Sequence, residues 1–404
     1  MFTISKFSML CIALLGFSFT ASTQAEVTTA QKPTKIDLST LQTQADKGDA
    51  KAQYMLFQSY WGKDNDQALK YLNLAAAQDY PLALNGLGWV YYKGDGVPQD
   101  YQKAVLYLNK AKDKGELHAY GNLATLYQRG DALPKDEKKA VELLTYTADR
   151  GDAIGAYNLA LAYVQGSGVT QDKTKSIQYL KKSADFGLAT AQQMYGSMLY
   201  KGNEIAQNAP EGIRYLTLAA EQEDTKSQAI LGGLYATDNP YVKKDAKLAF
   251  KWTERAAKGN NLDAIGNLGW MYLQGEGVTK DIKVGVKALE FASEHGNIPA
   301  TRNLGMIYAQ GKDVKQDYKR SVHYFTKIAE TGDLSANLFL GDAYYQGKGV
   351  KKDPEKAMAL WIQAQQAGFG LDPQSMNQFN LCGLDTRIVD SKPVHAVACP
   401  MGAL

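Results

Sequence analysis

Cysteine and histidine are scarce in this chain of 404 residues, which contains three cysteines and four histidines. The histidines are far apart along the sequence, at His118, His295, His323 and His395. The glycine-rich phosphate-binding loop, the serine-hydrolase elbow and the paired histidines of zinc proteases are absent from the sequence. Since no motif for catalytic or metal chemistry stands out, we expect no catalytic site, no cofactor and no bound metal.

The sequence also has little net charge and no long apolar run. The formal net charge is +3, with 22% of residues charged, which argues against a nucleic-acid partner.

An apolar run at residues 9–19 follows Lys6 and precedes small residues up to Ala25. A run this short does not span a bilayer as a helix. We therefore predict a signal peptide over residues 1–25 and a periplasmic or secreted mature chain without a membrane span. The alternative is a permanent anchor.

Two of the cysteines, Cys382 and Cys399, lie 17 residues apart near the end of the chain. Together with His395 they would provide three metal ligands. A tetrahedral site needs a fourth protein ligand or an open catalytic position, and no fourth candidate is nearby. Because export favours oxidised thiols, we expect a disulfide between Cys382 and Cys399 rather than a metal site.

A period of 36 residues accounts for most of the chain. It is clearest for a tyrosine, replaced once by leucine, near the end of an apolar segment. We call this residue position 0; it is Tyr60, Tyr91, Tyr127, Tyr163, Leu199, Tyr235, Tyr272, Tyr308 and Tyr344. Position −4 is leucine or, once, tyrosine, and position −3 is glycine or alanine from the second repeat onward. Positions −8, −4, −1 and 0 share one helix face, so we predict an amphipathic helix whose small residues allow a neighbouring helix to approach closely.

A second helix is predicted after each of these segments. It begins at an aspartate or asparagine, which cap helices by accepting bonds from free amides: Asp100, Asp136, Asp172, Asn208, Asp245, Asp281, Asp317 and Asp353. The segment often ends in glycine, which suits a left-handed C-terminal cap. A further helix at about residues 38–47 is expected to cap the stack, since terminal repeats of solenoids are atypical. The sixth repeat has a one-residue insertion.

The combined pattern resembles the Sel-1-like repeat family, a relative of the tetratricopeptide solenoids. It reads A-x-x-x-L-G-x-x-Y, then G-x-G-V-x-x-D, then A-x-x-Y/W-L-x-x-A-A, and it covers residues 49–368. Residues 26–48 precede the repeats, and residues 369–404 form a tail. The resemblance implies an all-α, right-handed superhelical solenoid of about nine helix-turn-helix repeats. It also implies a role as a scaffold or adaptor.

In a solenoid of this type, the first helix of each repeat lines the concave surface, where positions −6 and −2 face the groove. Tryptophan, tyrosine, methionine and arginine are enriched in interface cores. The candidate partner contacts are therefore Trp89, Tyr157, Trp270, Arg302 and Met306. A second row at position −5 has side chains that can bond a peptide backbone: Asn122, Asn158, Asn267 and Asn303. The alternative for both sets is packing against the next repeat.

These features predict an exported interaction protein that binds a protein or peptide partner on its concave face. A narrower form, which the family resemblance implies, is an immunity or regulatory protein that sequesters an envelope-acting toxin or enzyme. The alternative is a protein that binds or processes peptidoglycan or another glycan. Groove aromatics would suit sugar stacking, but no paired acid and base is visible. The partner's identity and the oligomeric state are left open by the sequence.

Overall fold

A computed structural model of the protein describes residues 38–369, which form 19 α-helices and no β-strand. The predicted signal peptide at residues 1–25 and the predicted disulfide between Cys382 and Cys399 lie outside the described residues. The chain divides into two compact units, with unit 1 ending at Ala219 and unit 2 beginning at Ala220. After the first helix, α1 (Leu38–Asp46), the helices alternate as nine pairs. The predicted all-α solenoid of nine repeats is thereby confirmed.

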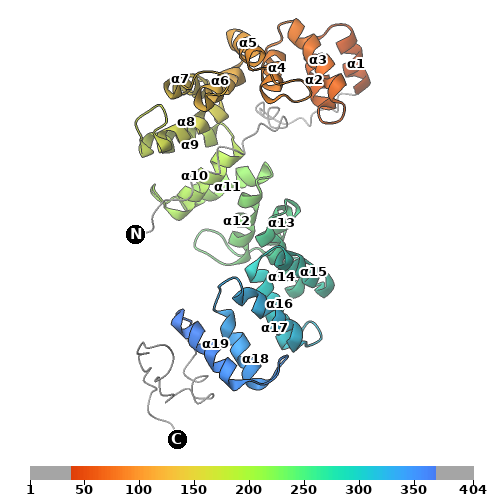
Figure 1. Ribbon diagram of the computed structural model, residues 1–404, viewed down its shortest axis with the longest axis vertical. Helices are drawn as coiled ribbons and strands as arrows, with labels where there is room; N and C mark the ends of the chain where they lie inside the picture. Colours follow the sequence, from red (N-terminus) through yellow and green to blue (C-terminus); the bar gives the residue numbers. More distant parts are fainter. Residues whose placement is uncertain (1–37, 370–404) are drawn as a thin grey trace. The chain divides into compact units, whose positions relative to one another are not determined.

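We call the first helix of each pair the A helix and the second the B helix. The A helices are α2 (Ala50–Tyr60), α4 (Pro81–Lys93), α6 (Leu117–Arg129), α8 (Ala153–Gln165), α10 (Ala189–Lys201), α12 (Thr225–Ala236), α14 (Leu262–Gln274), α16 (Ile298–Gln310) and α18 (Ala336–Gln346). The B helices are α3 (Asn65–Ala77), α5 (Tyr101–Asp113), α7 (Glu137–Ala148), α9 (Lys173–Asp185), α11 (Ala209–Glu221), α13 (Ala246–Lys258), α15 (Ile282–Glu294), α17 (Tyr318–Ala329) and α19 (Pro354–Gln366). Within each unit, an A helix lies beside the B helix that follows it (Figure 1).

The small residue at position −3 lies where the A and B helices of one repeat cross. A Cβ at Gly88 would lie 2.6 Å from Leu108 Cγ, closer than real carbon atoms approach. In α14 and α15 two glycines meet, since a Cβ at Gly269 would lie 2.8 Å from the carbonyl oxygen of Gly285. Glycine within a helix costs up to about 1 kcal/mol relative to alanine. The close helix contact offsets this cost, as the sequence predicted.

The predicted N-caps of the B helices are confirmed, and each has a second role. The Asp100 side chain accepts the Lys103 amide at 2.9 Å, and the same bond recurs in the other repeats. In addition, the backbone N–H of Asp100 donates to the carbonyl of position 0, Tyr91, at 2.9 Å. This second bond is present in all eight repeats from the second onward, at 2.9 to 3.0 Å. One residue thus closes the loop and starts the B helix.

The sixth repeat keeps this arrangement despite its extra residue. The Asp245 N–H donates to the Tyr235 carbonyl at 2.9 Å, as in the other repeats. Within the longer loop, the Asn239 side chain accepts the amides of Tyr241 and Val242, both at 3.1 Å. The insertion is therefore absorbed between the two fixed ends of the loop.

Buried glutamines connect some A helices to the helix that precedes them, a feature that the sequence does not reveal. Gln192 on α10 donates from Nε2 to the Ala184 carbonyl on α9 at 3.1 Å. Gln53 and Gln228 make the same bond to Ala45 and Ala220, both at 3.0 Å. Each of these carbonyls also accepts a backbone amide of the following turn, so the glutamine provides a second donor at the helix end.

We expect Gly269→Ala to lower the free energy of unfolding of unit 2 by roughly 1–3 kcal/mol, because the added methyl overlaps backbone atoms that cannot move away freely. Gly233→Ala is the matched control, since a Cβ at this helical and exposed position meets nothing within 4 Å. It should stabilise α12 by up to about 1 kcal/mol. Chemical denaturation followed by circular dichroism measures both. If both changes alter the free energy of unfolding equally, the close approach of the two helices at Gly269 does not restrict residue size.

Candidate functional site

Side-chain groupings typical of metal chemistry are not found in the described part of the chain. Between residues 38 and 369, no three histidine, cysteine, aspartate or glutamate side chains gather as a metal ion would require. Over the same residues, no helix combines the length and apolar character needed to cross a membrane. The predicted partner contacts lie on the A helices.

Two of the five predicted contacts, Trp89 and Tyr157, are buried. Trp89 on α4 is 9% exposed and packs beside Tyr92, with ring centroids 5.3 Å apart, while Lys93 Nζ lies 5.1 Å from its ring centroid. Tyr157 on α8 is 5% exposed, and its hydroxyl donates to Met194 Sδ on α10 at 3.6 Å. Packing within and between neighbouring repeats, rather than exposure to a partner, is the role that this burial indicates.

The other three predicted contacts remain accessible, and all lie in unit 2. Trp270 on α14 is 39% exposed, and Met306 on α16 is 37% exposed. Both occupy position −2 of neighbouring A helices that contact each other. Arg302 on α16 is half-buried; its guanidinium donates to Asp333 Oδ2 at 2.7 Å and to Ser335 Oγ at 3.1 Å. Two exposed apolar side chains are thus bordered by an ion pair.

The predicted asparagine row is not uniform. Asn122 is buried and donates from Nδ2 to Asn85 Oδ1 on α4 at 2.8 Å, which links two A helices. Its own Oδ1 has no hydrogen-bond partner. Asn158 and Asn303 are half-buried, and Asn267 is exposed. A backbone-binding role stays a prediction for this row, and for Asn122 the structure shows a link between repeats.

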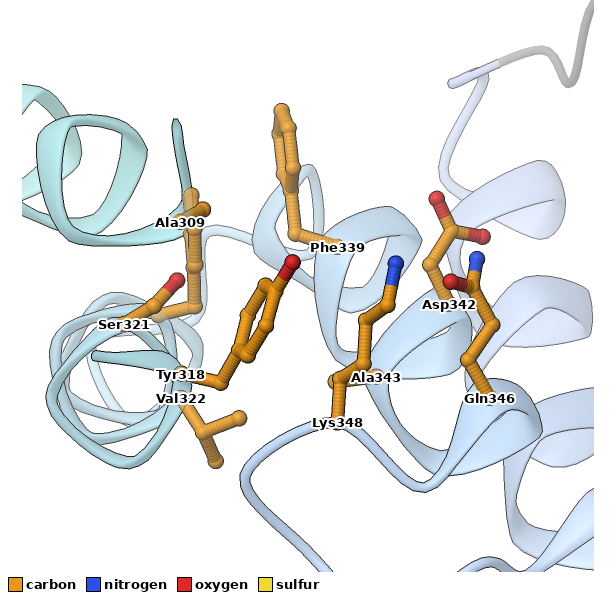
Figure 2. A pocket seen from close by; sticks show the side chains of 10 residues that line it. Ala309, Tyr318, Ser321, Val322, Phe339, Asp342, Ala343, Gln346 and Lys348 are labelled. Atoms are coloured by element: carbon orange, nitrogen blue, oxygen red, sulfur yellow. The ribbon is translucent and has the colours of Figure 1, made fainter. Parts of the chain in front are cut away.

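A pocket of about 180 Å³ lies between α16, α17 and α18 in unit 2. Figure 2 shows the side chains that line it: Ala309, Tyr318, Ser321, Val322, Phe339, Asp342, Ala343, Gln346 and Lys348, to which Phe325 is added. Phe325 and Phe339 stack in parallel, with centroids 4.3 Å apart and planes 6° apart. Small-molecule sites usually measure about 300–1,000 Å³. This pocket therefore has room for a single side chain rather than for a whole cofactor.

A smaller recess of about 110 Å³ occupies the equivalent place in unit 1, between α8, α9 and α10. Ser176 and Leu180 stand where Ser321 and Phe325 stand in unit 2, counted from the B-helix cap. A recess at this place in the repeat is thus present in both units. Lys173 and Glu204, which both line the recess in unit 1, form an ion pair between Nζ and Oε1 at 3.0 Å.

Phe339 and Asp342 were not predicted as site residues, although the sequence contains a signal for each. Phe339, which is 41% exposed, stands at position −5, where four other repeats have asparagine. Asp342 is the one charged residue at position −2 among the nine repeats. The signal is therefore a departure of the last repeat from the pattern of the others.

One histidine, His118, lies near the start of α6 and contacts a carboxylate. Its Nδ1 is 2.5 Å from Glu116 Oε1, and the same oxygen accepts the His118 backbone amide at 3.1 Å. The hydrogen bond with Glu116, together with the charges of Glu116 and Asp152, raises the pKa of His118 above its ordinary value of 6.5, while burial opposes this rise. Since Glu116 is also the N-cap of α6, the pair stabilises the start of this helix.

Comparison with known proteins gives one family and several related structures. The family model described as Sel1 repeat matches nine consecutive segments between residues 50 and 369. A Sel1 repeat protein from Oxalobacter formigenes has 28% identity, with 81% of this chain and 93% of that chain covered and a TM-score of 0.51. No protein with a curated description matches the chain significantly.

Two further structures are similar at lower TM-scores. A protective antigen present in uropathogenic Escherichia coli strains has 27% identity, with 86% of this chain and 93% of that chain covered and a TM-score of 0.47. An immunity protein from Pseudomonas aeruginosa has 20% identity, with 62% and 81% covered and a TM-score of 0.26. Scores this low add nothing to the argument from the family model.

We expect the stability of unit 1 to depend on pH through His118. A raised histidine pKa contributes stability that is fully present below about 6.5 and is lost as pH rises through the folded-state value. The His118→Gln variant should lack this dependence, whereas His323→Gln, at an exposed position on α17, should keep it. Chemical denaturation between acid and mildly alkaline pH measures the difference. If the wild type and His118→Gln lose stability in parallel, the Glu116 pairing does not have this effect.

Proposed function

Because the chain belongs to the Sel1 repeat family, we propose that it is an exported interaction protein whose A helices in unit 2 bind a protein or peptide partner. Sel1 repeat proteins act as protein–protein interaction modules. Nine such repeats account for residues 50–369, so nearly all of the described chain consists of this kind of module. The family membership supports binding in general, and the exposed side chains support the location.

The observation that carries the location is the exposure of Trp270 and Met306 at the same position of neighbouring A helices. Large apolar side chains are normally buried, as Trp89 is in this protein. Tryptophan anchors often contribute most of the energy of an interface when a partner removes them from water. The ion pair between Arg302 and Asp333 beside them resembles the polar rim that surrounds such anchors.

Export to the periplasm is part of the proposal, and it is supported by the signal-like residues 1–25 and by the two cysteines near the end of the chain. A narrower version is an immunity or regulatory protein that holds an envelope-acting toxin or enzyme inactive. A toxin gene beside this gene would support that version. A neighbouring secretion or polysaccharide operon would support a scaffold.

We expect the double variant Trp270→Ala, Met306→Ala to lose its partner in affinity capture from periplasmic extract. The loss should be at least about thirtyfold in affinity, since removing an interface anchor costs roughly 2 kcal/mol or more. The matched control is Phe291→Ala, which removes a side chain that is 44% exposed on the B helix α15 of the same unit. This control should retain the partner.

The unfolding of the variants is measured alongside, because only a folded variant reports on binding. Trp270→Ala should leave the helical content unchanged, whereas Trp89→Ala should destabilise unit 1 by roughly 3–5 kcal/mol, as expected for a buried tryptophan. If the wild type and the double variant capture the same protein equally well, the partner does not bind at Trp270 and Met306. Retention of purified peptidoglycan, with no protein captured, would contradict protein binding itself.

A further inference from the structure

The pocket between α16, α17 and α18 contains a half-buried carboxylate without a close cation. Asp342 on α18 lines the pocket. Among the described residues, no lysine or arginine nitrogen lies within 4.0 Å of its carboxylate oxygens, the distance at which an ion pair is counted. Burial raises the pKa of its carboxyl, while a hydrogen bond with Trp361 and the charge of Lys348 act in the opposite direction. The charged form of Asp342 is thus only partly compensated within the folded chain.

Lys348 also lines the pocket, beside Tyr318. Its Nζ lies over the ring of Tyr318, 5.3 Å from the centroid. Figure 2 shows these two side chains next to each other, with Asp342 and Gln346 on the other side of Lys348. Lys348 thus stands between Tyr318 and Asp342 and forms one side of the pocket without an ion pair to the Asp342 carboxylate.

The rest of the lining suits an aliphatic chain. The stacked rings of Phe325 and Phe339 form one wall, and Val322, Ala309 and Ala343 add apolar surface. Long cationic side chains bury their methylene stems on such surfaces and keep the charged end at a polar group. Cations also bind favourably near aromatic rings. The pocket thus offers an apolar lining with an acidic group at one side.

The equivalent recess in unit 1 shows what makes this pocket different. There, the residue at the place of Asp342 is Ser197, which does not line the recess. The acidic residue of that recess, Glu204, is already paired with Lys173 at 3.0 Å. The unit 2 pocket thus has an acidic group without an ion-pair partner, whereas the acidic group of the unit 1 recess has one.

We propose that this pocket receives a lysine or arginine side chain of the partner polypeptide, with its stem on Phe325 and Phe339 and its cation at Asp342. The inference rests on the proposed function, because it takes the ligand to be a polypeptide bound along the A helices of unit 2. It adds a chemical requirement to that function: the partner presents a basic residue to the last repeat. The attraction between this cation and the half-buried carboxylate would stabilise the complex.

The test uses the full mature chain and short acetylated, amidated peptides in which one position at a time is fixed as lysine, arginine, norleucine or glutamate. Norleucine keeps the aliphatic stem of lysine and lacks its charge. We expect the wild type to bind the best lysine or arginine peptides at least about tenfold more tightly than their norleucine counterparts. Asp342→Asn should abolish this preference, and Asp342→Lys should favour glutamate.

The control variant is Glu355→Gln, which removes one negative charge from an exposed position in the first turn of α19, within the same hairpin. It should keep the wild-type preference, which separates a local contact from the overall charge. Asp342→Asn should also melt no lower than the wild type, because it removes a charge that burial disfavours. A weaker binder that is at least as stable cannot be explained by a purely structural role of Asp342.

The inference is overturned if the wild type shows no preference for a basic residue, or if Asp342→Asn keeps the preference. The proposed function survives that result as long as the Trp270→Ala, Met306→Ala variant still loses its captured partner. If no peptide binds the wild type at all, the inference is also overturned, and capture from periplasmic extract decides separately whether the protein binds a partner.

Discussion

The close crossing of the two helices within each repeat is the constraint on which the rest of the structure depends. At Gly269 and Gly285, or at Gly88 and Leu108, the helices approach until there is no room for one more methyl group. This approach fixes how each A helix lies on its B helix. Since the crossing recurs at the same position, residues at position −2 return to the same face of successive A helices. The alignment of Trp270 and Met306 follows from that repetition.

Features that depend on neighbours in the sequence were predicted well. The N-caps, the small residues at the crossing and the left-handed glycines such as Gly115 depend on a few adjacent residues and on helix periodicity. The buried glutamine bonds, such as that of Gln192 to Ala184, were missed because they join two helices across a turn. A polar residue on a helix does not reveal from sequence alone which carbonyl it reaches.

Whether a side chain is buried was harder to predict than the side of the helix on which it lies. Trp89 and Trp270 share a residue type and a position, yet one is buried and the other is exposed. Tyr92 and Lys93 cover Trp89, whereas leucine and glutamine stand at the matching places after Trp270. The pocket at Asp342 was not predicted either, because its shape depends on side chains from three helices. Its two unusual residues were nevertheless visible as departures from the repeat.

The bond between the Asp245 N–H and the Tyr235 carbonyl has a consequence for how such a chain can change over generations. It holds both ends of the loop in the sixth repeat as in the others, although this loop is one residue longer. Length added between these two anchors leaves the helices on either side in register. The loops are therefore places where insertions can accumulate and acquire new contacts. The helix crossings, in contrast, restrict both residue size and spacing in every repeat.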